Sequence, residues 1–342
     1  MDASNNFREA KKNMKRIVII ATGGTISAHH EDRTDFRNYR SGHYSGEDFV
    51  TQLPELADYA EVEVVQLSNF SSTRMEDSHW SILHQTVMHH LAEEDCDGVV
   101  ITHGTNTLEE SAYLLHLTLK SEKPVIITGA QRPFSALGSD AQINLLDAVR
   151  VAADDSARGM GVLVVLNNVI ASAREVTKGE TYKLHSFQLH AGGQIGSVDA
   201  DRSVQLYYQP LRRYGVDSAL ATFQLPKTLP MVDIIYSYAG ATGEMIDALI
   251  AKGVQGIVIA GTGAGRITPK EEEALRRAKE AGIYIVMSSR VGAGRVVPIE
   301  CYDDLPMITA DNLSPQKARI LLKLGLNAGL SFAELQNLFD TH

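Results

Sequence analysis

Short apolar runs rich in β-branched residues recur along the first half of the chain and predict strands. They are Arg16–Ala21, Glu61–Gln66, Val99–Ile101, Pro124–Thr128 and Gly161–Leu166. A run without polar alternation, such as Val99–Ile101, is typical of a strand buried on both faces of a parallel sheet. Because helical patterns separate these runs, we expect a parallel sheet with helices on its faces.

The helix that follows the second predicted strand carries an apolar stripe. Trp80, Leu83, Val87 and Leu91 recur at helical spacing, so we expect them to face the core. The histidines of this helix lack the i, i+4 pair that places two imidazoles on one face for a metal. We therefore expect a solvated face and no metal site at His79, His84, His89 and His90.

Residues 207–230 break the alternation of strands and helices, because they contain three prolines, an arginine pair and no clear period. We expect this segment to link an N-terminal domain, residues 16–206, to a C-terminal domain, residues 231–342. The strands predicted in the second domain are Val232–Tyr238, Gly256–Ala260 and Ile283–Ser288. The expected fold is α/β, with a larger N-terminal parallel-sheet domain flanked by helices and a smaller C-terminal α/β domain.

Helix starts in the second half carry clear capping signals. Thr268 with Glu271 and Ser331 with Glu334 have the spacing of a capping box. Another start is indicated at Ser314, which proline follows. We expect a helix to begin at each of these positions.

The composition limits the kinds of partner and compartment. The chain has 342 residues and a net charge of −10, which argues against nucleic acid or an anionic membrane as the main partner. No segment reaches the roughly 20 apolar residues needed to cross a bilayer, and no secretory signal is visible. The two cysteines, Cys96 and Cys301, exclude a disulfide framework and suit a reducing compartment. We expect a cytoplasmic protein.

The polar turn after Val99–Ile101 is the first candidate site. It reads HGTN at residues 103–106, and a helix is predicted to begin at Thr107. The Thr107 hydroxyl can cap the backbone N–H of Glu110, and the Glu110 carboxylate can reciprocate. Open α/β sheets bind their ligands at the carboxyl ends of the strands, which is where this turn lies.

Two threonines follow predicted strands and are candidate nucleophiles. Thr25 comes after the Gly23-Gly24 turn, and Thr105 comes after the central strand. A threonine hydroxyl reacts poorly until a base or a charged neighbour activates it. The candidate activators are Tyr39, in the polar loop 28–46, and Lys178, whose pKa falls if it is partly buried beside Thr105. Backbone N–H groups of the glycine turn are candidates for an oxyanion site.

Two longer motifs carry a family resemblance. ATGGTIS at residues 21–27 and VVITHGTNTLEESAY at residues 99–113 resemble the two signature motifs of the bacterial L-asparaginase/glutaminase family. Further matches follow in order along nearly the entire chain, and they are denser toward the type II, periplasmic-type branch. These matches are Asn38-Tyr39, Ser72, Met75, REVTK at 174–178, SSRV at 288–291 and PQKAR at 315–319.

The resemblance implies an amidohydrolase that uses a threonine nucleophile and neither metal nor cofactor. Thr25 matches the nucleophile, and Tyr39 matches the loop tyrosine that activates it. Thr105 and Lys178 match the threonine and lysine that activate water or the nucleophile. The implied reaction converts the side-chain amide of asparagine, or of a similar small molecule, to a carboxylate and ammonia.

The resemblance also implies a binding site and an assembly. Ser72 matches the residue that holds the substrate α-carboxylate. Family members are usually homotetramers, dimers of intimate dimers, in which a carboxylate of the neighbouring chain completes each site; Glu300 is the match for it. The substrate-binding residues implied in this way are Gly24, Ser72, Thr73, Gly104, Asn106 and Glu300.

The chain departs from the family pattern at three positions. Asn106 replaces an Asp that binds the substrate ammonium, Arg74 stands where an Asp is common, and Ala264 replaces an Asn. These changes leave open an amino-modified asparagine analogue as substrate, or an amide-binding protein that has lost catalysis. A nucleotide-binding protein is a further alternative, although the glycine-rich segment 261–265 has the wrong spacing for a dinucleotide fingerprint and predicts a structural turn.

Overall fold

The computed structural model describes residues 14–189, 192, 194–222 and 224–342. The chain forms two compact units. The first consists of Met1–Leu211 and Thr222–Leu225, and the second consists of Arg212–Ala221 and Pro226–His342. Parts of residues 207–230 therefore belong to both units.

An eight-stranded sheet is the centre of the first unit, in the order β10-β9-β6-β5-β4-β3-β1-β2. The neighbours from β2 to β5 are parallel, as expected, whereas β6, β9 and β10 continue the sheet in antiparallel fashion. The antiparallel strands escaped prediction because they have only three or four residues each, too few to establish a period. The strands are β1 (Arg16–Gly23), β2 (Glu61–Phe70), β3 (Gly98–Thr102), β4 (Val125–Thr128), β5 (Val162–Leu166), β6 (Val169–Ser172), β9 (Gly196–Val198) and β10 (Val204–Leu206).

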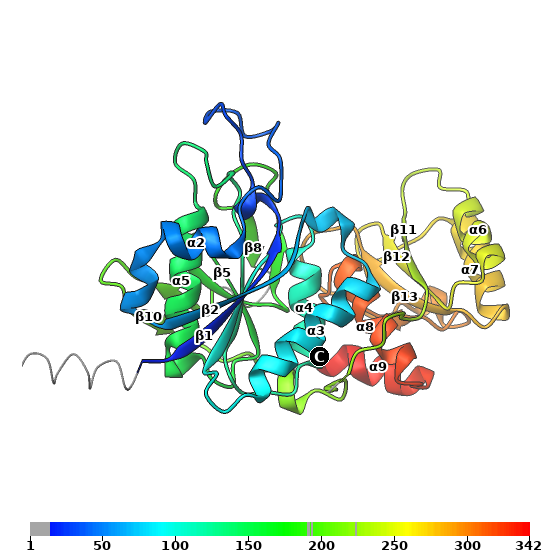
Figure 1. Ribbon diagram of the computed structural model, residues 1–342. Coiled ribbons are helices and arrows are strands. Elements are labelled where there is room, and N and C mark those ends of the chain that lie inside the picture. Colours follow the sequence, from blue (N-terminus) through cyan, green and yellow to red (C-terminus); the bar gives the residue numbers. More distant parts are fainter. Residues whose placement is uncertain (1–13, 190–191, 193, 223) are drawn as a thin grey trace, which may run out of the picture. The chain divides into compact units, whose positions relative to one another are not determined.

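Helices cover both faces of this sheet (Figure 1). Helices α2 (Gly46–Gln52) and α5 (Ala141–Ala153) lie on one face, and α3 (Asp77–Ala92) and α4 (Leu108–Thr118) lie on the other. Alternate residues of β1 face each layer, and Ile17 and Ile19 pack into the core cluster that contains much of α5. The predicted stripe of α3 is confirmed, since Trp80, Leu83, Val87 and Leu91 are all buried.

The strand order creates a switch point at the carboxyl end of the sheet. Strand β1 lies between β2 and β3, so the chain winds to one side of β1 first and to the other side afterwards. Ligands of open α/β sheets bind in the crevice at such a reversal. The two turns that carry Thr25 and Thr105 therefore flank the expected ligand site.

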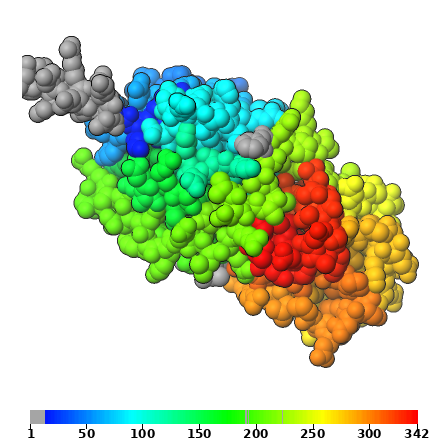
Figure 2. Space-filling view, turned by 90° about the horizontal axis from the view of Figure 1, so that it is seen from below, coloured from blue at the N-terminus to red at the C-terminus, as the bar shows by residue number. Residues whose placement is uncertain are grey.

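A four-stranded parallel sheet, in the order β11-β12-β13-β14, organises the second unit. The capping boxes predicted at Thr268 and Ser331 and the helix start after Ser314 are confirmed. The Gln336 side-chain oxygen of α9 accepts the backbone N–H of Thr309 in β14. The C-terminal residues, which are red in Figure 2, form part of the surface seen there. The elements are β11 (Val232–Tyr236), β12 (Gly256–Gly261), β13 (Tyr284–Ser289), β14 (Ile308–Thr309), α6 (Glu244–Lys252), α7 (Pro269–Glu280), α8 (Pro315–Asn327) and α9 (Phe332–Thr341).

Among the described residues, no helix combines the length and the apolar character that a membrane crossing requires.

Candidate active site

Two glycines hold the ends of β1 and β3 against each other. Gly24 has φ of 89°, and a Cβ atom placed on it would lie only 2.3 Å from the Gly104 Cα. A Cβ atom on Gly104 would in turn lie 2.7 Å from the Ser72 Oγ. Only glycine permits this approach of three backbone segments. The contact places Thr25, Thr105 and Ser72 in one region of the switch point.

Thr25 lies beside the loop tyrosine that the sequence pairs with it. The Thr25 Oγ1 is 3.0 Å from the Tyr39 hydroxyl oxygen. Tyr39 belongs to the loop 28–46, which a bridge between His29 and Arg40 closes. The backbone N–H groups of residues 43 and 44 both donate to the Ser27 carbonyl, so the loop is fastened to the turn that contains Thr25.

Lys178 reaches Thr105 from a small hairpin of strands β7 (Val176–Lys178) and β8 (Phe187–Leu189). The Lys178 Nζ donates to the Thr105 Oγ1 at 2.9 Å. Burial of the ammonium group lowers the pKa of Lys178, while the nearby Glu109 carboxylate acts in the opposite direction. The arrangement favours the neutral amine more than solvent would, and a neutral amine can accept a proton.

A residue that sequence reasoning missed completes this group. The Gln131 Oε1 lies 3.3 Å from both the Lys178 Nζ and the Thr105 Oγ1. Gln131 follows β4, the strand next to β3, at the same edge of the sheet as Thr25 and Thr105. The rule that identified the two threonines, a polar side chain just after a parallel strand, was available to identify it as well.

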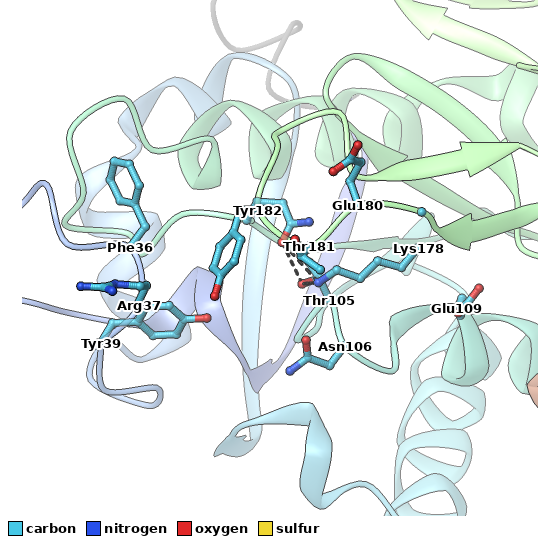
Figure 3. Close-up of a pocket in the computed structure, with 12 residues that line it drawn as sticks. Phe36, Arg37, Tyr39, Thr105, Asn106, Glu109, Lys178, Glu180, Thr181 and Tyr182 are labelled. Carbon is cyan, nitrogen blue, oxygen red and sulfur yellow. Dashed lines mark hydrogen bonds between the residues drawn. The ribbon is translucent and has the colours of Figure 1, made fainter.

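Tyr39, Thr105, Gln131 and Lys178 line a cavity of about 620 Å³. Thr25 is not among the lining residues and is connected to the cavity through its bond to Tyr39. In Figure 3, Tyr39 and Tyr182 lie on one side of Thr105, while Lys178 and Glu109 lie on the other. Asn106 is exposed to this cavity and presents a neutral amide where the family motif has a carboxylate. The remaining lining residues are Phe36, Arg37, Gln131, Gly179, Glu180 and Thr181.

The other predicted binding residues occupy different environments. Ser72 is buried beside Gly104 and begins a short 3-10 helix, Ser72–Arg74, whereas Thr73 is exposed. Glu300 is exposed in the second unit, at the start of the 3-10 helix Glu300–Tyr302. Their roles in binding stay predictions.

The capping box predicted at Thr107 is wrong. The Thr107 Oγ1 donates instead to the Ser72 carbonyl at 2.9 Å, and its side chain makes no capping bond to α4. The Glu110 N–H is bonded to the Thr107 carbonyl. The acceptor of the Thr107 hydroxyl lies 35 residues away in the sequence, so no local sequence pattern predicts this bond.

His103 joins the site to the core through a chain of hydrogen bonds. Burial lowers the pKa of His103 to about 4, so the imidazole is neutral near pH 7. Its Nδ1 lies 2.9 Å from the Gly104 carbonyl, which can only accept, so the Nε2 accepts from the Ser111 hydroxyl at 3.0 Å. Ser111 in turn accepts the Trp80 Nε1–H at 2.9 Å. Every bond has one possible direction, and the chain orients the Gly104–Thr105 peptide.

The histidines of α3 are not a solvated face, because His84 and His90 are buried. Burial lowers the pKa of His84. Within the described ranges, one group has three ligand atoms close enough to share a metal ion, formed by His89, His90 and Glu93. Glu93, however, already accepts from Arg16 at 2.8 Å and from His90 at 3.1 Å, and these bonds account for its position.

The other departures from the family motif lie outside the cavity lining. The Arg74 guanidinium carbon is 5.7 Å from the centroid of the Phe70 ring. Ala264 belongs to the glycine-rich segment after β12, where Thr262 and Arg266 exchange backbone hydrogen bonds of 2.7 and 2.8 Å. The prediction of a structural turn at that segment is confirmed.

Comparisons with known proteins agree with this fold. The model of the N-terminal asparaginase domain matches residues 16–212, and that of the glutaminase/asparaginase C-terminal domain matches residues 231–339. The chain therefore belongs to the asparaginase family. It is an amidohydrolase, as the resemblance predicted.

Individual relatives are similar over almost their whole length. L-asparaginase 2 of Bacillus subtilis is 38% identical over 332 residues, which are 97% of this chain and 88% of the relative. Glutaminase-asparaginase of Pseudomonas fluorescens is 36% identical over 337 residues, 97% of this chain and 91% of the relative. The crystal structure of a probable cytoplasmic L-asparaginase from Campylobacter jejuni has a TM-score of 0.92 and 36% identity, covering 96% of this chain and all of that chain.

Proposed function

We propose that this protein hydrolyses the side-chain amide of asparagine, or of an asparagine-like compound, to a carboxylate and ammonia, with Thr25 as the nucleophile. The observation that carries the proposal is the presence of two hydroxyl–activator pairs at one switch point. Thr25 is paired with Tyr39 at 3.0 Å, and Thr105 is paired with Lys178 at 2.9 Å. The names of the relatives, L-asparaginase and glutaminase-asparaginase, support the same substrate class.

The chemistry proceeds in two halves. The Thr25 Oγ1 attacks the amide carbon while its proton passes to the Tyr39 oxygen, and the proton of the Tyr39 hydroxyl passes to the amide nitrogen; the C–N bond then breaks and ammonia leaves. Water then attacks the threonyl ester, gives up a proton and releases the carboxylate, which regenerates the Thr25 hydroxyl. The Thr105–Lys178 pair serves as the base for water or for the nucleophile, a task that the lowered pKa of Lys178 favours.

A second candidate substrate class rests on Asn106. A hydrogen bond to a charged group contributes roughly 1.5–3 kcal/mol, and a neutral one contributes about 1 kcal/mol. The neutral Asn106 amide at the cavity is therefore less suited to a free ammonium than a carboxylate is. We propose an asparagine analogue altered at its amino group as the alternative substrate.

The nucleophile is tested with single variants. We expect Thr25→Ala and Thr105→Ala each to lower ammonia release from the best amide of a panel by about a thousandfold or more, because the groups act as a unit. Thr86→Ala is the matched control, since the Thr86 hydroxyl bonds only to its own helix, at the Ile82 carbonyl, among the contacts of the described residues. If Thr25→Ala and Thr105→Ala both keep their activity, the assignment of Thr25 as the nucleophile is wrong. If the wild-type chain binds amides but releases no ammonia, the protein is an amide-binding protein that has lost catalysis.

We further propose a cytoplasmic homotetramer in which Glu300 of a neighbouring chain completes the site. Large apolar side chains are exposed on the first unit at Tyr207, Tyr208 and Leu211, as expected of surfaces that a second chain covers. Cys96 and Cys301 are both free, which is compatible with a reducing compartment.

A further inference from the structure

Gln131 occupies a position between the two groups that the proposed chemistry uses. Its Oε1 accepts from the Lys178 Nζ and from the Thr105 Oγ1, each at 3.3 Å. This orientation of the amide gives the Lys178 Nζ and the Thr105 Oγ1 an acceptor, and it leaves the Gln131 Nε2 without a hydrogen-bond partner among the described residues. The side chain is 92% buried, so water does not replace these bonds freely.

The loop after β4 holds Gln131 rigidly. The Asp140 carboxylate accepts the backbone N–H of Gln131 and that of Arg132, both at 3.0 Å. Asn144 donates to Asp140 at 3.0 Å and to the Gly129 carbonyl at 2.9 Å. A Cβ atom on Gly129 would lie 3.2 Å from the Thr105 Cγ2, so the loop packs directly on Thr105. This amount of backbone support is what a precisely placed side chain requires.

We propose that Gln131 is a positioning residue, whose side-chain oxygen orients the Thr105 hydroxyl and the Lys178 amine toward each other. An amide oxygen accepts hydrogen bonds and takes no proton, so Gln131 does not compete with Lys178 as a base. When it accepts one N–H of a neutral Lys178, the rotation of the amine is restricted and its lone pair can face the Thr105 Oγ1. The single hydrogen of the Thr105 hydroxyl, which the Gln131 oxygen accepts in the structure, then turns to that lone pair for the proton transfer. This inference rests on the proposed function, in which Lys178 acts as the base.

The charge of residue 131 matters as much as its shape. Lys178 is already influenced by the Glu109 carboxylate on α4, which favours the ammonium form. The other charged or titratable groups that line the cavity are Arg37, Tyr39, Glu180 and Tyr182, and Glu180 is paired with Lys183 at 2.7 Å. A neutral amide at position 131 supplies an acceptor without adding a second carboxylate, which would stabilise the ammonium further.

The first test separates positioning from binding. Gln131→Met keeps the length of the side chain and removes the acceptor. We expect kcat to fall by about tenfold to a hundredfold while KM changes by less than about threefold, because the group acts on catalytic geometry. Gln205→Met, at an exposed position of β10, is the matched control and should leave both constants unchanged.

The second test reads the pH profile, which a merely structural role would not move. If the reaction needs neutral Lys178, activity increases as the pH rises through the pKa of Lys178, because the neutral fraction of the amine increases. Gln131→Glu is nearly isosteric and places a negative charge beside Lys178, so the rising limb should move up by about one pH unit or more. Gln131→Met removes an acceptor that stabilises the ammonium form of Lys178. The rising limb of its pH profile should therefore not move to higher pH. Gln205→Glu should leave the limb in place.

The two levels of the proposal fail in different ways. If both Gln131 variants keep kcat within twofold and the limb unmoved while Thr25→Ala and Thr105→Ala are inactive, the positioning role is wrong and the proposed function stands. If the threonine variants are active, the proposed function itself is wrong. Should Gln131→Met fail to fold, the pH limb of Gln131→Glu decides the question alone.

Discussion

At the scale of single residues, the cavity is lined by a lysine amine, a nearby carboxylate and a neutral amide, whose charges together determine which ligands fit. Lys178 has a lowered pKa because it is half-buried, and Glu109 limits that lowering. Asn106 contributes no charge beside Thr105, although the family motif has a carboxylate there. The substrate preference therefore depends on which charges a ligand brings to Asn106.

Asn106→Asp tests this dependence. If the natural substrate carries a modified amino group, the variant should gain about tenfold or more in kcat/KM for plain L-asparagine, because a charge-assisted hydrogen bond replaces a neutral one. Ammonia release from a panel of amides measures the effect. Asn337→Asp, an exposed position of α9, makes the same change of charge away from the cavity lining and serves as the control. Efficient use of asparagine by the wild type, with no gain in Asn106→Asp, would exclude the altered substrate.

Single residues were predictable where a strand end identified them. Thr25 and Thr105 were found from their positions after apolar runs, and the structure brings Tyr39 and Lys178 to them. Gln131 also follows a strand end and the same rule was available for it, but its bonds to groups 26 and 47 residues away depend on the fold and could not be predicted from the local sequence. The partner of Thr107 was unpredictable for the same reason, since long-range packing decides it.

At the scale of elements, the site depends on a contact between two turns rather than on any one strand. Gly24 and Gly104 meet without side chains, and this contact sets the separation of β1 and β3 at their carboxyl ends. The longer parallel strands were predictable from apolar runs, and α3 was predictable from its apolar stripe, whereas the two-residue parallel strand β14 was not predicted. The short antiparallel strands, and the extension of β2 to Phe70, depend on hydrogen-bonding partners that become neighbours only in the fold.

A pair of glycine variants isolates the effect of this contact. Gly24 and Gly159 both have positive φ, of 89° and 71°, but only Gly24 has backbone atoms in the place of a Cβ. Gly159→Ala should lower the free energy of unfolding by about 1–2 kcal/mol, the cost of the left-handed conformation. Gly24→Ala should cost roughly 1–3 kcal/mol more, because the two turns must separate and because the Gly24 backbone, with φ of 89° and ψ of −165°, lies in a region that is nearly restricted to glycine.

Chemical denaturation of both variants measures the difference, and ammonia release shows whether the separated turns still act together. Equal losses of stability would contradict a tight contact between Gly24 and Gly104.

At the scale of the whole molecule, each unit has its own sheet and core, and the described cavity is lined by residues of the first unit. The predicted contribution of Glu300 from a neighbouring chain would make the assembly part of the site. The sequence predicted this only through the family resemblance, because the exposure of Glu300 in one chain is compatible with either a free surface or an interface.

Mixing two inactive variants tests the shared site. A Thr25→Ala chain keeps Glu300, and a Glu300→Ala chain keeps Thr25, so an assembly of both contains some intact sites. If neighbours complete one another, co-refolded variants should recover about a quarter of the wild-type activity, as random pairing across a symmetric dimer interface gives. Light scattering reports the assembly. A mixture that stays as inactive as its components would show that Glu300 serves its own chain, whereas a Glu300→Ala chain that is active alone would show that Glu300 has no role.

The glycine contact also divides the site into parts with different freedom to change during evolution. The place of a Cβ is occupied by the Gly104 backbone at Gly24 and by the Ser72 side chain at Gly104, so we expect selection to reject other residues at both positions and to keep the spacing of the two threonines. The side chains of Phe36, Arg37 and Asn106 also face the cavity, and none of them takes part in the proposed proton transfers, so they can be replaced one at a time. New substrates are therefore acquired at the rim of this scaffold, while its reactive centre persists.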